Sequence, residues 1–239
     1  MGVAKNGFMY CVYTKNGEDS KYTEECKKSI QSLKDCVPDA SISVYTNASM
    51  AGLKNVNVIY DENIVQAHIA KAYALLNSPY DKTVFIDTDI LVHSVGLNAI
   101  FDVLTDDIPF AATPVNYNPE DFLKPRSINT GLLGVKQTKY TKKILNRWIN
   151  LFHDWFNKKG VILDQVSFKK IMDQDFRRVH LLPPWFHFRP CLFENWVKNA
   201  VITHHYMTPI YGHSDAVRIL IDRLETYYSE LPPSKRTNC

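Results

Sequence analysis

Short apolar runs alternate with segments of helical periodicity along the first part of the chain. The runs have the length and the β-branched or aromatic content of buried strands, and polar or turn-forming residues bound them. Between the runs, apolar residues recur every three or four positions, as on one face of an amphipathic helix. This order predicts a mainly parallel sheet covered by helices on both faces. The expected strands span residues 7–14, 42–45, 56–60 and 84–92, and the expected helices span 22–36 and 64–76.

The rest of the chain is less regular but adds elements of the same α/β class. No clear linker interrupts it, so we expect a single domain over residues 1–230, followed by a disordered tail or linker stump over 231–239. A further domain after that tail is compatible with the sequence. The expected helices span 140–156 and 164–172, with a last one starting near Ser214, and short strands are expected at 110–112, 131–135, 179–182 and 200–203.

Charge and composition exclude several classes of protein. The net charge is +3 and no block of Lys and Arg is dense enough for a nucleic-acid-binding tail, although a mildly basic chain suits a phosphate-bearing substrate. No apolar run approaches the roughly 20 residues that cross a bilayer. Five cysteines without a Cys-x-x-Cys pair indicate reduced thiols. We therefore expect a cytoplasmic protein with no transmembrane segment and no nucleic-acid partner.

Two carboxylates, Asp87 and Asp89, interrupt the apolar run expected to form the strand over 84–92. Burying a charge costs several kcal/mol, on the order of 5, unless the charge is paired or bound to a metal. In an extended chain, residues two apart point to the same side, so both carboxylates could face one divalent cation. A surface turn, or an ion pair with a nearby Lys or Arg, remains an alternative. A second Asp-x-Asp, at Asp173 and Asp175, lies in polar surroundings and is typical of a solvated turn.

Polar residues also follow the other expected strands. In mainly parallel sheets, ligands bind at the carboxyl ends of the strands, so these residues are expected to form one rim. The rim consists of Thr14, Thr46-Asn47, Asp61-Glu62 and Asp87-Thr88-Asp89.

Four motifs follow one another in an order that resembles a known family. They are the segment 71–92 with its Asp-x-Asp, Asn129-Thr130-Gly131 within an apolar run, Asp164-Gln165 at a helix start, and a late strand ending in His204-His205. In this order they resemble the GT-A glycosyltransferases of the glycogenin and lipopolysaccharide galactosyltransferase group, which is glycosyltransferase family 8. The Gly and Lys-Pro-Trp segment that usually follows the family's histidine is absent here, which indicates a divergent branch.

The resemblance implies a GT-A fold with a Rossmann-like central sheet and a metal-dependent glycosyltransferase activity. The enzyme would move a sugar from a nucleotide-diphosphate sugar to a glycan, glycoconjugate or other hydroxyl acceptor. The resemblance implies UDP as the nucleotide and retention of anomeric configuration. An inverting enzyme, in which Asp164 would be the general base, remains an alternative. Carboxylates combined with an imidazole suit Mn²⁺ better than Mg²⁺.

The same resemblance assigns roles to individual residues. The metal ligands would be Asp87 and Asp89 with His204 or His205, the catalytic residues Asp164 and Gln165, and the acceptor-binding residues Trp185 and His187. The donor-binding residues would be Thr14, Thr46, Asn47, Lys71, Asp87, Thr88, Asn129 and Gly131.

Most of these assignments compete with a plainer explanation. Thr14, Thr46 and Asn47 also suit the capping of strand ends, Lys71 suits an exposed helical lysine, and Asp164 suits a helix N-cap. The aromatic run that contains Trp185 and His187 also suits core packing.

Two other functions compete with glycosyl transfer. A sugar-phosphate nucleotidyltransferase would need a Gly-rich loop after the first strand, but residues 14–19 hold one glycine and two acids. A non-catalytic nucleotide-sugar-binding module would keep the fold without the chemistry.

Overall fold

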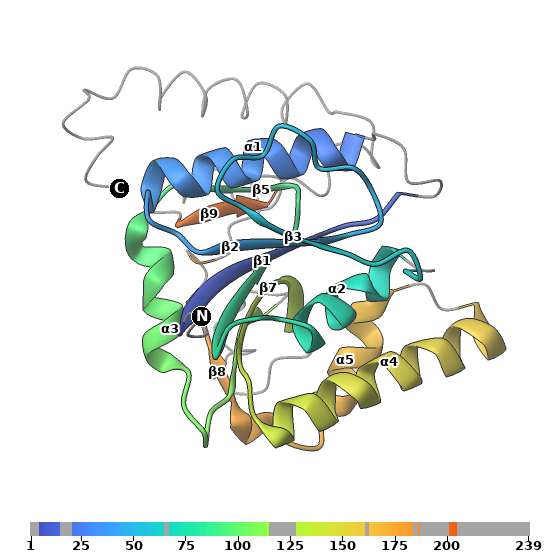
Figure 1. The fold of residues 1–239 in the computed structure, drawn as a ribbon. Coiled ribbons are helices and arrows are strands. Elements are labelled where there is room, and N and C mark those ends of the chain that lie inside the picture. The colour runs from blue at the N-terminus through green and yellow to red at the C-terminus, as the bar shows by residue number, and fades with distance from the viewer. Residues whose placement is uncertain are drawn as a thin grey trace, which may run out of the picture.

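A seven-stranded sheet forms the centre of the protein (Figure 1). The computed structural model describes residues 5–14, 21–64, 67–114, 128–160, 163–183, 186 and 201–204. The strand order is β3-β2-β1-β4-β7-β6-β8. β7 pairs antiparallel with both of its neighbours, while all other pairs are parallel, so the predicted mainly parallel α/β sheet is confirmed. The strands are β1 (Asn6–Val12), β2 (Ile42–Thr46), β3 (Asn57–Tyr60), β4 (Lys82–Ile86), β6 (Phe110–Pro114), β7 (Ile128–Lys136) and β8 (Val179–Leu181).

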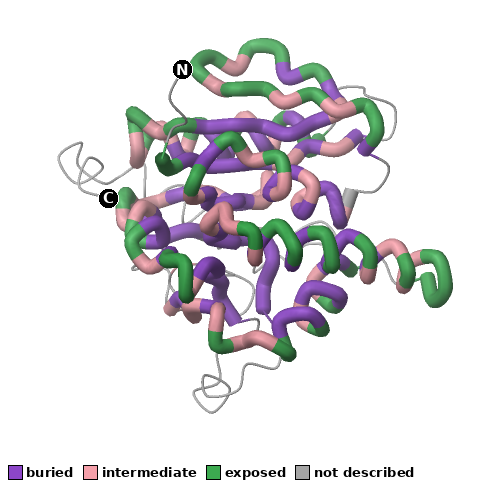
Figure 2. The backbone as a smooth tube through the Cα atoms, turned by 60° about the horizontal axis from the view of Figure 1, so that its bottom comes forward, coloured by how far each residue is buried: buried purple, intermediate pink, exposed green. Residues whose placement is uncertain are grey.

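Helices cover both faces of this sheet, as the strand–helix alternation predicted. One face packs against α1 (Lys21–Cys36) and α3 (Ala99–Val103), and the other against α2 (Ala67–Leu76), α4 (Lys139–Lys159) and α5 (Asp164–Met172) (Figure 1). Neighbouring residues of a strand therefore enter different cores: Phe8 and Tyr10 pack on the side of α1, while Met9 packs on the side of α2 and α4. The strands of the sheet are mostly buried, and the outer faces of the helices are exposed (Figure 2).

The expected single strand over 84–92 is wrong. β4 ends at Ile86, and the Ile90 N–H donates a hydrogen bond to the Asp87 carbonyl at 3.2 Å, which closes a turn. After this turn the chain forms β5 (Ile90–Val92), which pairs antiparallel with β9 (Ile202–His204) in a separate two-stranded sheet. A strand that continued through Asp87-Thr88-Asp89 between two apolar layers would bury two charges. Asp is also favoured at the first position of such turns.

The structure adds short elements that the sequence did not reveal. α3 and the 3₁₀ turns at Val95–Asn98 and Phe176–Arg178 are too short to show a periodicity. The turn predicted at Asp173–Asp175 is confirmed, and Asp173 is exposed beside Lys169. Asp175, however, is half-buried and accepts a hydrogen bond from the Tyr140 hydroxyl at 2.6 Å. The helix expected from Ser214 and the tail over 231–239 lie outside the described residues.

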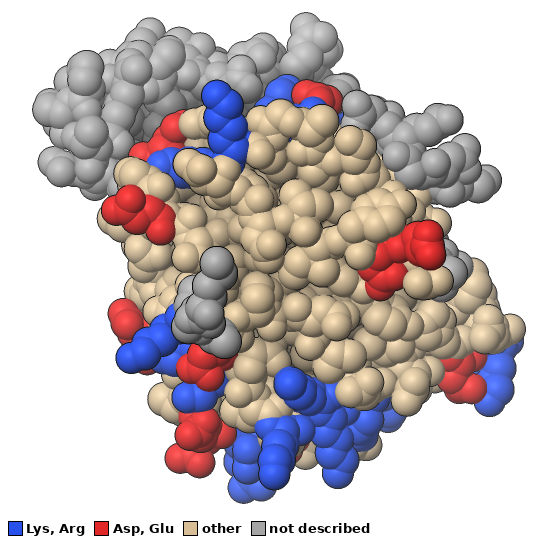
Figure 3. Space-filling model, viewed as in Figure 1, with Lys and Arg blue, Asp and Glu red and all other residues tan. Residues whose placement is uncertain are grey.

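α4 presents the most basic surface among the described helices. Thr138 caps its first turn and Gly160, in the left-handed conformation, ends it. Its exposed side carries Lys139, Lys142, Lys143 and Arg147. Lys and Arg gather near the start of this helix in Figure 3. None of the helices that the structure describes combines the length and apolar character needed to cross a membrane. Among the described cysteines, Cys11, Cys26 and Cys36 form no disulfide.

Candidate active site

The candidate site lies where the end of β4 meets the start of β7. Because β7 runs opposite to β4, its first residues lie beside the last residues of β4, with Leu132 opposite Ile86. Just beyond this pair, the Asp87 N–H donates to the Gly131 carbonyl at 2.8 Å. The Gly131 N–H in turn donates to Asn129 Oδ1 at 2.7 Å. The two motifs Asp87-Thr88-Asp89 and Asn129-Thr130-Gly131 therefore adjoin at the carboxyl edge of the parallel strands.

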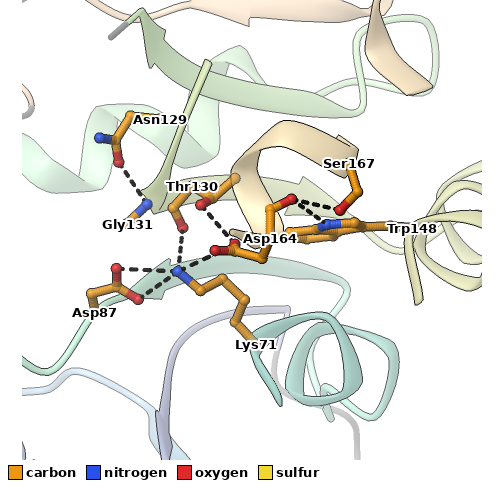
Figure 4. Close-up of polar contacts among 8 residues, drawn as sticks. All are labelled: Lys71, Asp87, Asn129, Thr130, Gly131, Trp148, Asp164 and Ser167. Atoms are coloured by element: carbon orange, nitrogen blue, oxygen red, sulfur yellow. Dashed lines mark hydrogen bonds and ion pairs between the residues drawn. The ribbon is translucent and has the colours of Figure 1, made fainter. Parts of the chain in front are cut away.

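Lys71, on α2, places its ammonium between two carboxylates (Figure 4). Its Nζ lies 3.0 Å from Asp87 Oδ1, 3.2 Å from Asp87 Oδ2 and 3.6 Å from Asp164 Oδ2. It also lies 3.4 Å from the Thr130 carbonyl. The Lys71 side chain is only 12% exposed, so the explanation of an exposed helical lysine is wrong. The ion pair with a nearby lysine, one of the alternatives for Asp87, is present.

The charge state of Lys71 is set by these neighbours. Burial acts to lower the pKa of Lys71, but the charges of Asp164, Asp87 and Asp89, together with the hydrogen bond to Asp87, outweigh burial and raise the pKa above its ordinary value of 10.5. Lys71 is therefore a permanent cation within a group of three carboxylates. Such a charge group at the carboxyl edge of a sheet is typical of a functional site, although structural ion pairs can produce the same effect.

Asp164 is the first residue of α5. The N-cap position belongs to Leu163, so the explanation of Asp164 as a helix N-cap is wrong. Its carboxylate instead accepts a hydrogen bond from the Thr130 hydroxyl at 2.9 Å and faces Lys71. Its carbonyl accepts from Trp148 Nε1 at 2.9 Å and from Ser167 Oγ at 2.7 Å. Asp164 is thus buried, with polar partners for both its carboxylate and its carbonyl (Figure 4).

Thr14, Thr46 and Asn47 join the ends of β1 and β2. The Asn47 side chain accepts from the Thr14 N–H at 2.9 Å and donates to the Thr14 carbonyl at 2.7 Å. Thr46 Oγ1 accepts from the Ala48 N–H at 2.9 Å. The capping role is therefore present, and donor binding by these residues stays a prediction. Among the described residues, the buried Thr14 hydroxyl has no hydrogen-bond partner, so a polar group remains available at this edge.

Asp61, which follows β3, is fixed by its own hydrogen bonds. The Tyr45 hydroxyl donates to Asp61 Oδ2, and the Asn63 N–H donates to Asp61 Oδ1 at 2.9 Å. The bond from Tyr45, followed by the bond from Asn63, lowers the pKa of Asp61 below its ordinary value of 3.8. Asp61 therefore supports the polar edge of the sheet in its ionised form.

Asp61→Asn is expected to lower the free energy of unfolding near neutral pH but not in acid. A carboxyl whose pKa is lowered by folding stabilises the protein above its unfolded pKa, and this contribution disappears as the pH falls through the folded pKa. Urea denaturation at about pH 7 and about pH 3 measures the effect, which should shrink at the lower value. Glu62→Gln, which changes an exposed neighbouring carboxylate, is the matched control. A deficit of Asp61→Asn that is equal at both pH values would contradict the assignment.

The expected metal ligands are placed in part. Asp89 lies in the turn between β4 and β5, and the pairing of β5 with β9 sets residue 204 opposite Ile90. The backbone of residue 204 therefore lies beside the end of the Asp-x-Asp turn. Among the side chains that the structure describes, no three His, Cys, Asp or Glu are arranged to hold a metal ion. The His204 side chain and the residues His205, Trp185 and His187 lie outside the described part.

Two expected site residues lie beside the cluster. Thr88 is half-buried in the same turn as Asp89, and Gln165 is half-buried in the first turn of α5, next to Asp164. Their roles in donor binding and catalysis stay predictions.

Three residues of the cluster were not assigned from the sequence. Thr130, Trp148 and Ser167 all donate hydrogen bonds to Asp164. Thr130 had a detectable signal, because a hydroxyl inside a buried apolar strand needs a partner. Trp148 and Ser167 gave no such signal. A tryptophan on the apolar face of a helix is expected to pack in the core, and a serine within a helix is common.

Comparison with known proteins identifies the fold. No model of a known protein family matches the chain, and no curated protein sequence does. Solved structures do match. Galactosyltransferase LgtC, in complex with donor and acceptor sugar analogues, matches at 14% identity and a TM-score of 0.56, over 98% of this chain and 100% of that one.

Two further matches are glycosyltransferases. One, involved in the glycosylation of the major capsid of PBCV-1, has 13% identity and a TM-score of 0.58, over 91% of this chain and 99% of that one. The other, GlyE of Streptococcus pneumoniae TIGR4, has 15% identity and a TM-score of 0.64, over 98% of this chain and 63% of that one. The described strand order and helical layers agree with these matches, and the chain has the GT-A fold of these glycosyltransferases.

Proposed function

We propose that this protein is a metal-dependent glycosyltransferase that uses a nucleotide-diphosphate sugar, with UDP as the nucleotide and retention of anomeric configuration. The observation that carries the proposal is the position of Lys71, buried between Asp87 and Asp164 at the carboxyl edge of a GT-A sheet. A buried cation shared by two carboxylates has no packing purpose that an apolar residue could not serve, since ion pairs of this kind add little net stability. Chemistry on a charged substrate explains it.

Asp87 and Asp89 would hold a divalent cation together with His204 or His205. The donor set fits in kind: two carboxylates lie at the turn, and the strand that ends at residue 204 runs beside it. Bound there, Mn²⁺ or Mg²⁺ would stabilise the charge that develops on the leaving diphosphate. Thr88 and the strand-end residues Thr14, Thr46 and Asn47 would contact the nucleotide side of the donor.

The remaining residues would act on the transferred sugar. Asp164 and Asn129 would bind its hydroxyls, Gly131 would allow the sugar to approach the backbone, and Gln165 would lie near the reacting face of the anomeric carbon. Lys71 would neutralise part of the repulsion between Asp87 and Asp164, so that both carboxylates can remain ionised in one site. The acceptor, a glycan or glycoconjugate, would bind near Trp185 and His187.

A panel of nucleotide-sugars with and without Mn²⁺ tests this proposal. A ligand that binds the folded state raises the free energy of unfolding, by about 2.7 kcal/mol at a concentration of roughly 100 times Kd. The melting temperature rises with it. We expect stabilisation by one or more UDP-sugars only when Mn²⁺ is present, with slow release of UDP from the same donors.

Other outcomes would identify a different function. Release of pyrophosphate from a nucleoside triphosphate and a sugar phosphate would indicate a nucleotidyltransferase. Binding of a nucleotide-sugar without any turnover would indicate a binding module. For an active donor, NMR of the initial product anomer decides between retention and inversion.

A further inference from the structure

Asp164 is held by two separate sets of contacts, one on its backbone and one on its side chain. Trp148 and Ser167 hold the carbonyl, which fixes the position of the first turn of α5. The side chain is held by Thr130 Oγ1 at 2.9 Å and by Lys71 Nζ at 3.6 Å. The backbone contacts set where the carboxylate lies, and the side-chain contacts set how it is turned.

Both side-chain contacts use the same oxygen. Thr130 and Lys71 approach Oδ2, and among the described residues Oδ1 of Asp164 accepts no hydrogen bond. The terminal torsion of an aspartate is broad, so without a directional contact the carboxylate plane can rotate about the Cβ–Cγ bond. Of the two contacts on Oδ2, the hydroxyl makes the shorter one and is the more directional, whereas the Lys71 ammonium sits closer to Asp87.

Thr130 itself is well fixed. It is 2% exposed and lies within β7, between the Asn129 side chain and the Gly131 backbone that this side chain holds. Its carbonyl faces Lys71 at 3.4 Å. The hydroxyl is therefore presented by the central sheet and does not depend on a loop for its position.

We propose that Thr130 is a positioning residue whose hydroxyl fixes the rotation of the Asp164 carboxylate plane, so that the oxygen that it does not occupy faces the sugar. This inference rests on the proposed function, in which Asp164 binds the hydroxyls of the transferred sugar. The hydroxyl of Thr130 does not contact the substrate. It acts through Asp164, by occupying Oδ2 and leaving Oδ1 to accept a hydrogen bond from a sugar hydroxyl.

Thr130→Val and Thr130→Ser separate the hydroxyl from the side-chain shape. Valine keeps the branched shape and removes the donor, while serine keeps the donor and removes a methyl group. We expect Thr130→Val to lower kcat about 10–100-fold, equivalent to about 1.4–2.7 kcal/mol of activation free energy, because the hydrogen bond to the Asp164 carboxylate is lost. The KM for the donor should stay within about 3-fold, since the nucleotide provides most of the binding. Thr130→Ser keeps the donor, so its kcat should stay within about 3-fold of the wild-type value.

Crystal structures of the same variants give a readout that does not depend on activity. In Thr130→Val the Asp164 carboxylate should be turned away from its wild-type orientation or be present in two, and in Thr130→Ser it should be unchanged. If the wild type transfers no sugar, the proposed function fails, but these structures still decide whether Thr130 orients Asp164. Thr130→Ala serves the same purpose if the valine variant does not fold.

Two results would overturn the inference. One is an Asp164 carboxylate that keeps its orientation in Thr130→Val. The other is a serine variant as impaired as the valine variant, which would show that the methyl group and its packing matter and the hydroxyl does not.

Discussion

Asp89→Ala is expected to abolish Mn²⁺-dependent binding of the nucleotide-sugar while leaving the fold intact. Asp89 lies in the turn after β4 and belongs to neither apolar core, so its removal leaves the packing of both cores in place. Loss of a residue that only supports a metal ligand costs about 10–100-fold in affinity or activity, and the loss of a ligand itself should exceed this. Thermal shift with the donor, with and without Mn²⁺, measures the effect, and circular dichroism checks the fold.

The second Asp-x-Asp of the chain provides a matched control. Asp173→Ala removes an exposed carboxylate that pairs with Lys169 in a turn, so it should leave Mn²⁺-dependent binding unchanged. His204→Ala and His205→Ala, made separately, then identify the nitrogen ligand, because one should be far more impaired than the other. If Asp89→Ala binds the donor as well as the wild type does in Mn²⁺, the assignment of a metal site to this turn is contradicted.

Lys71→Met is expected to destabilise the protein strongly as well as to inactivate it. The substitution leaves two carboxylates, of which Asp164 is only 9% exposed, without the cation that they share. Removing one partner of a buried ion pair costs about 3–5 kcal/mol. Urea denaturation measures this loss. Adding Asp164→Asn to Lys71→Met removes one of the two carboxylates left without a cation. It should recover about 0.5–3 kcal/mol of the lost free energy of unfolding, and a double-mutant cycle isolates this coupling.

An exposed ion pair shows what burial adds. Lys158 lies 2.6 Å from Asp154 on α4, and its side chain is 70% exposed. Lys158→Met should therefore change the free energy of unfolding by no more than about 1 kcal/mol. If Lys71→Met is no more destabilising than this control, the charges around Lys71 are solvated and the cluster is not the buried unit described above.

The α/β fold was predictable because its signals are local and repeated. Strands such as β1 and β4 contain uninterrupted apolar runs, and α1 and α4 carry regular apolar faces. Their alternation is enough to predict a parallel sheet with two helical layers. The break between β4 and β5 was not predictable in the same way, since the apolar run continues on both sides of the turn. Only the sheet order shows that residues 90–92 belong with β9.

The candidate site was predictable in its membership but not in its contacts. Sequence motifs identified Lys71, Asp87, Asn129 and Asp164, and the structure brings them together. That Lys71 is shared by two carboxylates could not be inferred, because helical periodicity does not say what lies opposite a helix. The bond from Thr130 to Asp164 joins β7 to α5, and no local pattern reports on such a contact.

The reversed strand β7 has a consequence for how the protein folds. Among the described strands, β6 and β8 are joined to the rest of the sheet only through β7, which lies between β4 and β6. Until β7 inserts, β4 is an open edge able to pair with another chain, and neither Thr130 nor Gly131 lies beside Asp87. Pairing of such distant segments is slow, so a partly folded chain would be prone to aggregation and unable to bind a donor. Under the proposed function, a nucleotide-sugar added during refolding would therefore stabilise only chains in which β7 has inserted.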